Sequence, residues 1–512
     1  MTSALPLLLV LLPALGSLLL LVLPERTIDS SAKASLIDRL VSSRAIALAI
    51  ALAVLAFSIV ATQQNGPVEF HRPWFRFQNL QVDIALVLRP TRHLVVVFLA
   101  FLATIACASI PSDERERPRH LAAGLLGALA STMAALLTED LVVLVIAVEL
   151  LTLPLAFVLV TRLREDSSSS ATTVLAGAAI ATASLLILAL AITNLPLPID
   201  GEGLALSASI ARTREACGGV TAHPDALLIA LALTLLPRAL LFPTHWGYTL
   251  LQHRFSAAGA VFALFGGLAL ATSLFSELAA SYCNNASFWN WTGARSHIVF
   301  ALAACGMTGL AISANLRESL RRRVAAAILV PLHVVVPLLA LGTAASHALA
   351  SMAVLALGLP AMTLVLGCFA FARRRDPGRL RDLRGVLRRM PRLFVMMVAA
   401  IVLGFGVPGS AAWRVFERSF ELLAARSMLL TIVCFGAILA AATSLVLVLL
   451  FSMRSEDSRR DREATSDLDA MECFRLALPL ACAVALAIGF EQALAAQTAS
   501  LVELGMRPEV AK

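Results

Sequence analysis

The stretch that decides the fold lies near the middle of the chain and runs Leu227-Leu-Ile-Ala-Leu-Ala-Leu-Thr-Leu-Leu-Pro237-Arg238-Ala-Leu-Leu-Phe-Pro243-Thr-His245. An arginine within so long an apolar run costs roughly 3 to more than 10 kcal/mol in lipid, so it must face protein or water and find a partner. Arg238 and His245 are seven residues apart, about two helical turns, which places them on nearly one face. Pro237 and Pro243 each remove a backbone donor, and a broken helix at membrane depth is tolerated only where it lines a buried cavity. The stretch therefore predicts a broken transmembrane helix with a buried cation; the alternative is a helix end with a snorkelling arginine.

Composition places the rest of the chain in a membrane. Of the 512 residues, 59% are hydrophobic and 14% are charged, and the mean hydropathy is +0.85, values typical of membrane proteins with many spans. The net charge of +8 is spread over short loops and forms no stripe with interleaved aromatic residues, which argues against a nucleic-acid partner. The eight cysteines form no CxxC pair and no Cys/His cluster with zinc spacing, so we expect neither a metal nor another cofactor.

The sequence predicts an all-α polytopic membrane protein with about fourteen transmembrane helices. Fourteen apolar segments are long enough to cross about 30 Å of hydrocarbon, and no soluble domain interrupts the series. These segments are 4–23, 45–62, 90–110, 121–138, 140–161, 172–195, 226–250, 258–280, 297–314, 324–344, 347–372, 393–412, 427–452 and 474–496. The first has no basic residue before it, so we expect a retained span rather than a cleaved signal peptide. The longest gaps, 63–89, 196–225 and 281–296, are expected to be connecting loops.

Basic residues set the expected orientation in the membrane. With the N-terminus outside, the inside loops hold 27 Lys and Arg, whereas the outside loops and the C-terminal tail hold 12. Because cytoplasmic loops are enriched in Lys and Arg, we expect both termini on the outer side. The most basic loop, from Arg373 to Arg392, carries nine arginines and is expected in the cytoplasm.

Charged residues inside the apolar segments point to the chemistry. Glu149 lies near the middle of the fifth segment, where a carboxylate is either neutral or paired because isolated burial is prohibitive. Arg238, in the seventh segment, is the only strongly basic residue at a comparable depth. We therefore expect an interhelical Glu149–Arg238 ion pair in the membrane interior.

Two further polar residues each leave two interpretations open. His333 lies in the first half of the tenth segment, where it either relays protons near neutral pH or packs as a hydrogen-bonded histidine. The run Gly406-Val-Pro408-Gly409 predicts a break in the twelfth segment, and Glu417 follows it. Glu417 either lines an ion path at this break or lies at the membrane interface.

Together these residues resemble the antiporter-like subunits of respiratory complex I. Glu149-Leu-Leu-Thr-Leu-Pro154 is similar to the fifth-helix signature of that family. Arg238, Pro243 and His245 reproduce the spacing of its seventh helix, with arginine in place of lysine. The break around Pro408 resembles its broken twelfth helix.

Loop sequences extend this resemblance over about residues 80 to 490. Leu320-Arg321-Arg322 resembles the family's basic turn before the tenth helix, Arg381-Asp-Leu-Arg-Gly385 its eleven-to-twelve loop, and Asp467-Leu-Asp-Ala-Met-Glu472 the approach to its last span. The chain lacks the lateral helix of the long L type, so the resemblance favours the M or N type.

The resemblance implies two inverted five-helix repeats, with broken helices in spans seven and twelve. It divides the chain into N-terminal helices and loops (1–120), a first repeat (121–280), a second repeat (281–452), and a charged loop with the last helix (453–512). It also implies neighbouring membrane subunits as partners, a bacterial inner membrane location, and no redox centre in this chain.

The chain departs from the family where the proton path is expected to cross the membrane centre. The central lysine of span eight aligns with Ala269, and the basic residue or histidine expected in span eleven falls near Leu357-Gly358. Arg238 also stays protonated, because a guanidinium holds its proton much more firmly than an amine, whereas a buried lysine can lose its proton. We therefore expect that the series of residues that would pass protons across the membrane centre is incomplete, which we call a depleted relay. We expect Glu149 and Arg238 to form a fixed ion pair, a Glu–Arg latch, rather than part of a proton-transfer path.

Four functional interpretations follow. The first is a membrane subunit of a proton-translocating NADH:quinone oxidoreductase-type complex, contributing to ion translocation without being catalytic itself. The second is a membrane subunit of a cation/proton antiporter or of an inorganic-carbon (bicarbonate) uptake complex. The third is a scaffold paralogue that has lost translocation. The fourth, a polytopic glycosyl-transfer enzyme using Arg238, His245 and His253, would need a large loop rich in acids and aromatics, which the sequence lacks.

Two cysteines fall in expected outer loops. Cys217 follows the sixth segment and Cys283 follows the eighth. A disulfide between them is one alternative in an oxidising compartment, and two free thiols are the other.

Overall fold

A computed structural model describes most of the chain and places it in two compact units. The described residues are 4–22, 42–64, 66–77, 80–110, 118–140, 143–151, 206–207, 257–282, 294–374, 385–453, 467–504 and 506. Unit 1 comprises Met1–Ala239, Ala258–Phe288 and Glu503–Met506, and unit 2 comprises Leu240–Ala257, Trp289–Val502 and Arg507–Lys512. Several residues named above lie outside the described part, namely Pro154, Cys217, Leu227, Pro237, Arg238, Pro243, His245, His253, Cys283 and Arg381.

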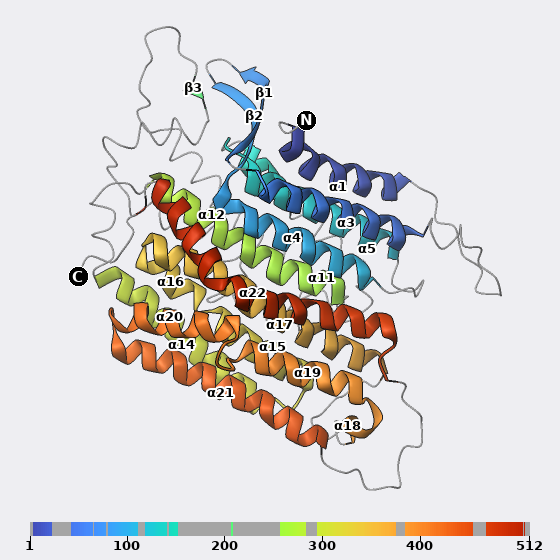
Figure 1. Ribbon diagram of the computed structural model, residues 1–512, viewed down its shortest axis with the longest axis vertical. Helices are drawn as coiled ribbons and strands as arrows, with labels where there is room; N and C mark the ends of the chain where they lie inside the picture. The colour runs from blue at the N-terminus through green and yellow to red at the C-terminus, as the bar shows by residue number, and fades with distance from the viewer. Residues whose placement is uncertain are drawn as a thin grey trace, which may run out of the picture. The chain divides into compact units, whose positions relative to one another are not determined.

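Unit 1 is built from apolar helices that pack side by side (Figure 1). The helices are α1 (Leu5–Val22), α3 (Ser43–Thr62), α4 (Pro90–Ala108), α5 (Pro118–Leu137), α11 (Ala257–Val261), the π-helical turn η3 (Phe262–Gly266) and α12 (Gly267–Tyr282). Helix α1 packs on α5, α3 packs on α4, and α12 contacts both α4 and α5. Helices α4 and α5 bury most of their side chains, as expected for the inner helices of a bundle.

A β-hairpin corrects the prediction of a purely helical fold. The segment 63–89, expected to be a connecting loop, contains β1 (Val68–Phe77) and β2 (Leu80–Leu88), which pair antiparallel. A short β3 (Leu206–Ser207) adds to β2 in parallel. The sequence of β2 alternates between apolar residues and Gln, Asp or Ala over its first six positions, a strand period. The strand was not expected because only apolar segments long enough to cross a membrane were taken as secondary-structure elements, and this run is too short.

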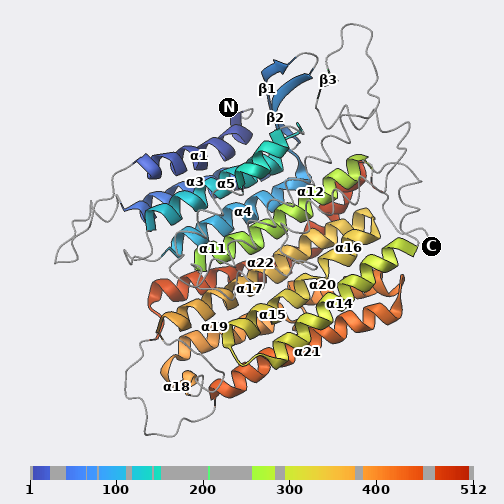
Figure 2. The same ribbon diagram turned by 180° about the vertical axis from the view of Figure 1, so that it is seen from behind.

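Unit 2 contains the longer series of helices (Figures 1 and 2). They are α14 (Ala294–Leu316), α15 (Leu320–Leu332), α16 (Val335–Leu341), α17 (Ala344–Arg374), α18 (Val386–Arg389), α19 (Pro391–Gly404), α20 (Ala411–Ala424), α21 (Met428–Met453) and α22 (Ala470–Glu503). Helix α17 is buried over almost its whole length and packs against α15, α16, α19 and α20. It therefore forms the core of unit 2.

The twelfth expected span is interrupted at Pro408. Helix α19 ends at Gly404 and α20 begins at Ala411. Between them, Gly406 has a φ of 94° and Gly409 a φ of 91°, a left-handed conformation that side chains with a Cβ rarely adopt. The hydroxyl of Ser410 then accepts a hydrogen bond from the Trp413 amide at 3.1 Å and caps α20.

Ten of the described helices are long and apolar enough to cross a membrane. The expected spans 172–195 and 226–250 lie outside the described residues, as does most of 140–161. The chain is thus a multi-pass, mostly helical membrane protein, and the count of fourteen spans and the inverted repeats remain predictions.

Candidate functional site

Glu149 is described, but its expected partner is not. Glu149 is half-buried in the helical residues 143–151. This helix is capped by Asp140, whose Oδ1 accepts a hydrogen bond from the Val143 amide at 3.1 Å. Arg238 and His245 lie outside the described residues, so the Glu149–Arg238 pair remains a prediction.

His333 lies fully buried where the helix of the tenth span breaks. It follows α15, and α16 begins two residues later at Val335. Pro331 lies in the last turn of α15, where its missing amide weakens the helix. The His333 Nδ1 lies 2.7 Å from the carbonyl oxygen of Leu329. This distance means that Nδ1 carries a hydrogen, which leaves Nε2 as the nitrogen able to accept a proton.

A second buried histidine, His347, was not singled out by the sequence. It lies in the first turn of α17, fully buried, with Nε2 3.1 Å from the carbonyl oxygen of Leu339 in α16. Thr343 and Ser346 cap the same turn by exchanging side-chain to backbone hydrogen bonds. The pattern that could have indicated His347 is a histidine close to Ser and Thr at the start of an apolar segment.

Glu417 lies on the exposed face of α20. On the same helix, Arg414 and Arg418 each lie 3.7 Å from a carboxylate oxygen of Glu491 in α22. Arg418 also lies 3.3 Å from Glu421. These side chains are at least one-third exposed, so their ion pairs are solvated and contribute little to stability.

Within the described residues, unit 1 contains a cluster of buried charges that the sequence did not predict. Arg92, in the first turn of α4, is 3% exposed, and Glu277 of α12 is 6% exposed. The Arg92 Nε lies 2.8 and 2.7 Å from the two Glu277 carboxylate oxygens, and Arg92 Nη2 contacts the same carboxylate. The Thr91 hydroxyl donates to Glu277 at 3.1 Å. This two-point geometry is the strong form of an arginine–carboxylate contact.

Glu139 extends the cluster toward the solution. It follows α5 and is 6% exposed. Its Oε1 lies 3.0 Å from Arg92 Nη2, and its Oε2 accepts a hydrogen bond from Arg89 at 3.0 Å. Arg89 is the most accessible member, with 26% of its side chain exposed. We call Arg89, Arg92, Glu139 and Glu277 the charge cluster.

Backbone contacts tie the charge cluster to β2. Arg92 Nη1 donates to the carbonyl of Val87 at 2.7 Å. The Glu139 amide donates to the carbonyl of Ala85 at 2.8 Å, and Asp140 accepts from the Asp83 amide at 3.4 Å. The start of α4, the end of α5 and the end of α12 therefore meet at the hairpin end of unit 1.

Span counting missed the charge cluster because each member lies at a segment boundary. Arg92 lies at the start of the segment 90–110 and was counted with the loop that it borders. Glu139 falls between the segments 121–138 and 140–161, and Glu277 lies near the end of its segment. One feature of the sequence could have indicated the charge cluster. Because successive spans alternate in direction, the start of span three and the ends of spans four and eight, where these residues lie, are expected on the same side of the membrane.

The centre of span eight carries no titratable group in the described structure. Ala269 is 1% exposed and follows the π-turn η3. A Cβ added at Gly266 would meet Leu102 at 3.5 Å and Leu99 at 3.7 Å, both from α4. The position aligned with the family's central lysine thus lies in close apolar packing.

Unit 2 contains a buried arginine that stabilises the end of a helix. Arg323 is 6% exposed, and its guanidinium donates to the backbone carbonyls of Asn315 and Arg317 and to the Ser444 hydroxyl. It therefore satisfies carbonyls that the end of α14 leaves open.

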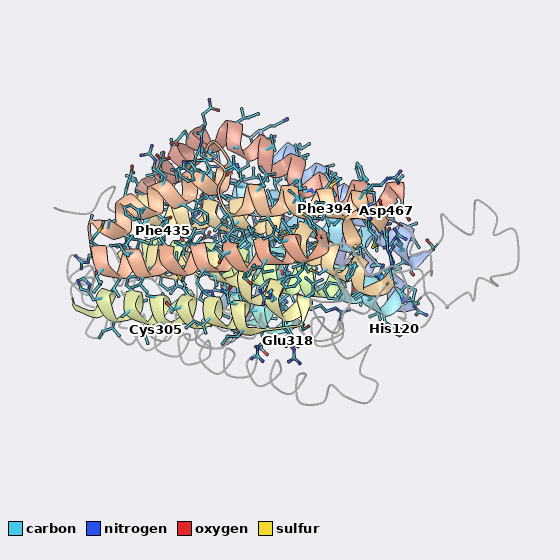
Figure 3. The ribbon with its side chains drawn as sticks, turned by 90° about the horizontal axis from the view of Figure 1, so that it is seen from below. His120, Cys305, Glu318, Phe394, Phe435 and Asp467 are labelled. Atoms are coloured by element: carbon cyan, nitrogen blue, oxygen red, sulfur yellow. The ribbon has the colours of Figure 1, made fainter. Side chains whose placement is uncertain are left out.

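The opposite ends of α17 and α22 are also joined by charges. Arg374, in the last turn of α17, pairs with Glu472 at the start of α22. Asp467 accepts hydrogen bonds from the backbone amides of Arg392 and Leu393, at the start of α19. Figure 3 labels Asp467 beside Phe394 of α19. These contacts fix the ends of the arginine-rich loop to the last helix.

Comparisons with known proteins identify the fold. No family model and no curated protein matches the sequence. Among solved structures, respiratory complex I from Thermus thermophilus is similar at a TM-score of 0.74 and 16% identity, covering 99% of this chain and 100% of the other. This chain has the fold of an antiporter-like membrane subunit.

Two further structures share this antiporter-like fold. The membrane-bound sulfane sulfur reductase, an archaeal respiratory membrane complex, matches at a TM-score of 0.78 and 13% identity over 98% of both chains. The Mrp complex from Dietzia sp. matches at 0.76 and 16% identity, covering 98% of this chain and 97% of the other. At such identities the antiporter-like fold is shared, whereas the chemistry must be argued from the residues of this chain.

Proposed function

We propose that this chain is an M/N-type antiporter-like subunit of a proton-translocating NADH:quinone oxidoreductase-type complex. The observation that carries the proposal is the likeness to a complex I chain over essentially the full length of both chains. The interruption of the twelfth span at Pro408 and the motifs around Glu149 support the same assignment.

Within this assignment, the expected Glu149–Arg238 pair acts as a latch that couples the subunit to its neighbours. Arginine keeps its proton when buried, so the pair contributes fixed charges rather than a mobile proton. The apolar packing around Ala269 supports this view, because span eight offers no basic group to receive a proton. The chain contributes to ion translocation through electrostatics and conformation, and holds no redox cofactor of its own.

The second candidate is a membrane subunit of a cation/proton antiporter or of an inorganic-carbon uptake complex. The likeness to the Mrp complex favours it as much as the complex I likeness favours the first candidate. The third candidate is a scaffold paralogue that does not translocate ions. The presence of Ala269 at the position of the family's central lysine favours it.

All three candidates place the chain in a multi-subunit assembly at the membrane. The proposed location is the bacterial inner membrane, with both termini on the outer side, as the bias of 27 to 12 basic residues indicates. The proposed internal division is a first repeat over 121–280 and a second over 281–452, with His333 and Glu417 in the second.

Copurification distinguishes the candidates. An affinity-tagged chain is solubilised from its native membrane in mild detergent, and the bound proteins are identified by mass spectrometry. Flavin- and iron–sulfur-containing partners are expected for the oxidoreductase assignment. A single soluble partner with a zinc-type site would instead favour carbon uptake, and recovery of the chain without any partner protein would contradict the subunit assignment.

A further inference from the structure

We infer that Arg321 and Arg322, in the first turn of α15, form a binding site for the phosphate headgroup of an anionic phospholipid. The inference goes beyond the proposed function and holds for each candidate assembly, because it concerns the lipid around the chain rather than the ions that cross it. Its evidence is a pair of arginines for which the described part of the chain provides no anion.

The turn between α14 and α15 carries an excess of positive charge. Residues 317–323 read Arg-Glu-Ser-Leu-Arg-Arg-Arg, four arginines and one glutamate, so their net charge is +3. Arg323 is accounted for, because its guanidinium donates to the carbonyls at the end of α14. Arg321 and Arg322 make no ion pair with any residue that the structure describes. Two positive charges of this turn are therefore left without a counter-charge.

The position of these arginines in α15 increases the attraction for an anion. The amino end of a helix carries a partial positive charge, so acidic residues are the favourable occupants of its first turn. The first turn of α15 contains no acidic residue, and the side chain of Ser319 at the N-cap accepts no hydrogen bond from the helix amides. A phosphate group there receives hydrogen bonds from guanidinium groups and helix amides alike.

Arg321 is held in place by the protein with its outer donors open. Its guanidinium carbon lies 5.3 Å from the centre of the Phe369 ring of α17, the distance of a cation–π contact. Among its nitrogens only Nε is enclosed, and no described residue provides an acceptor for any of the three. The ring contact thus orients the guanidinium, and its terminal nitrogens remain available to a ligand.

An exposed apolar stripe beside the arginines indicates that the phosphate belongs to a lipid. Ile312 and Leu316 of α14 are 55% and 76% exposed, and they lie four residues apart on one side of the helix. The stripe continues along α14 through Leu302 and Ile298, which are at least half exposed. From Ile298 to Leu316 it measures about 27 Å, nearly the thickness of the hydrocarbon core. This side of α14 therefore faces acyl chains.

The stripe ends where the unpaired arginines begin. Helix α14 packs on α15, and Leu316 is four residues before Leu320, the first residue of α15. A phospholipid matches both surfaces, because its chains lie on Ile312 and Leu316 while its phosphate binds the arginines. An acidic protein segment would match the arginines alone. In the proposed orientation this turn is cytoplasmic, and the cytoplasmic leaflet is the one rich in anionic lipid.

Native mass spectrometry of the purified full-length chain tests the inference. The delipidated protein is titrated with phosphatidylglycerol and, separately, with zwitterionic phosphatidylcholine, and the wild type is expected to retain phosphatidylglycerol preferentially. Arg321→Gln and Arg322→Gln should each weaken phosphatidylglycerol binding about fivefold, the usual contribution of one basic residue beside anionic lipid. Arg321→Lys keeps the charge but loses the planar donor group, so its affinity should lie between those of the wild type and Arg321→Gln.

Arg72→Gln is the matched control, because Arg72 is an exposed arginine of β1 in unit 1. It removes the same charge and should leave phosphatidylglycerol binding unchanged. An equal loss in Arg72→Gln and Arg322→Gln, or unaltered binding when Arg321→Gln and Arg322→Gln are combined, would overturn the inference. Equal retention of the two lipids by the wild type would do so as well. If Arg321→Gln does not accumulate, Arg322→Gln decides alone, because Arg322 is exposed.

Two further measurements identify the source of the anion. Inorganic phosphate at millimolar concentration should not displace phosphatidylglycerol, and displacement would show a site for a soluble anion instead. A photoreactive amino acid in place of Arg322, illuminated in the native membrane, should crosslink to phospholipid. A crosslink to another protein would show that an acidic partner covers the arginines and would contradict the lipid assignment. Neither measurement depends on which subunits copurify with the chain, so its outcome is separate from that of the proposed function.

Discussion

Arg92 and Glu277 are 185 residues apart in the chain, yet Arg92 Nε lies 2.8 and 2.7 Å from the two Glu277 oxygens. The pair joins the start of α4 to the end of α12, and neither residue is more than 6% exposed. A buried pair of this kind gains little over apolar packing, but it is strongly destabilising when only one partner is removed.

Removal of one partner of this pair should therefore be severe. Glu277→Gln is expected to lower the stability of unit 1 by roughly 3–5 kcal/mol, because Arg92 is left with an uncompensated buried charge. Glu277→Gln combined with Arg92→Met should be milder than the sum of the single changes. Thermal unfolding and membrane abundance measure both, with Glu69→Gln, at an exposed glutamate of β1, as the control. Additive losses would show that the two residues do not interact.

The stability of unit 1 should depend on Glu139 with a defined sign. Its pKa is raised by burial, so the folded state binds the proton more tightly than the unfolded state. Stability is then greatest at low pH and falls as the pH rises from the ordinary glutamate range through the raised pKa. Melting temperatures measured over a pH series should show this fall in the wild type. Glu139→Gln should remove that component, and an identical pH profile in the variant would contradict the assignment.

The expected Glu149–Arg238 pair has its own test. Arg238→Ala and Glu149→Gln should each cost roughly 3–5 kcal/mol, enough to lower assembly, and the double change should cost less than their sum. Arg238→Lys separates a latch from a proton relay, because lysine can lose its proton when buried. We expect weaker assembly and no gain in proton flux into vesicles. Increased flux in Arg238→Lys would support a relay through span seven.

Topology provides a test that does not depend on transport. The loop from Arg373 to Arg392 should lie in the cytoplasm, because it holds nine arginines. Reporter fusions after Arg374 and Arg389 should be active only for a cytoplasmic reporter. A fusion after Tyr282 should report the outer side. Labelling of single cysteines in the arginine loop from outside would contradict the orientation.

Much of the fold was predictable because lipid imposes one rule, that long apolar segments form helices. The break at Pro408 was predictable for the same reason, since proline and two glycines leave the backbone few helical options. The hairpin over Val68–Leu88 was not, because its alternation is short beside the spans.

The candidate site was predictable only in part. A buried residue such as His333 stands out within an apolar segment, so the sequence singled it out. Arg92, Glu139 and Glu277 each lie at a segment end, where charges are ordinary. Their pairing depends on which segment ends meet in space, and that information is carried by packing between helices rather than by local sequence.

The π-turn η3 determines how the helix that follows it, α12, is rotated about its own axis. A π-turn closes its hydrogen bond one residue later than an α-turn, so the five residues Phe262–Gly266 accommodate an additional residue. Each residue of an α-helix turns the chain by about 100°. Deletion of one residue within η3 would therefore rotate the far end of α12 by that angle. The angular setting of Glu277 toward Arg92, eleven residues beyond the turn, is thus determined by a single extra residue in an entirely apolar stretch.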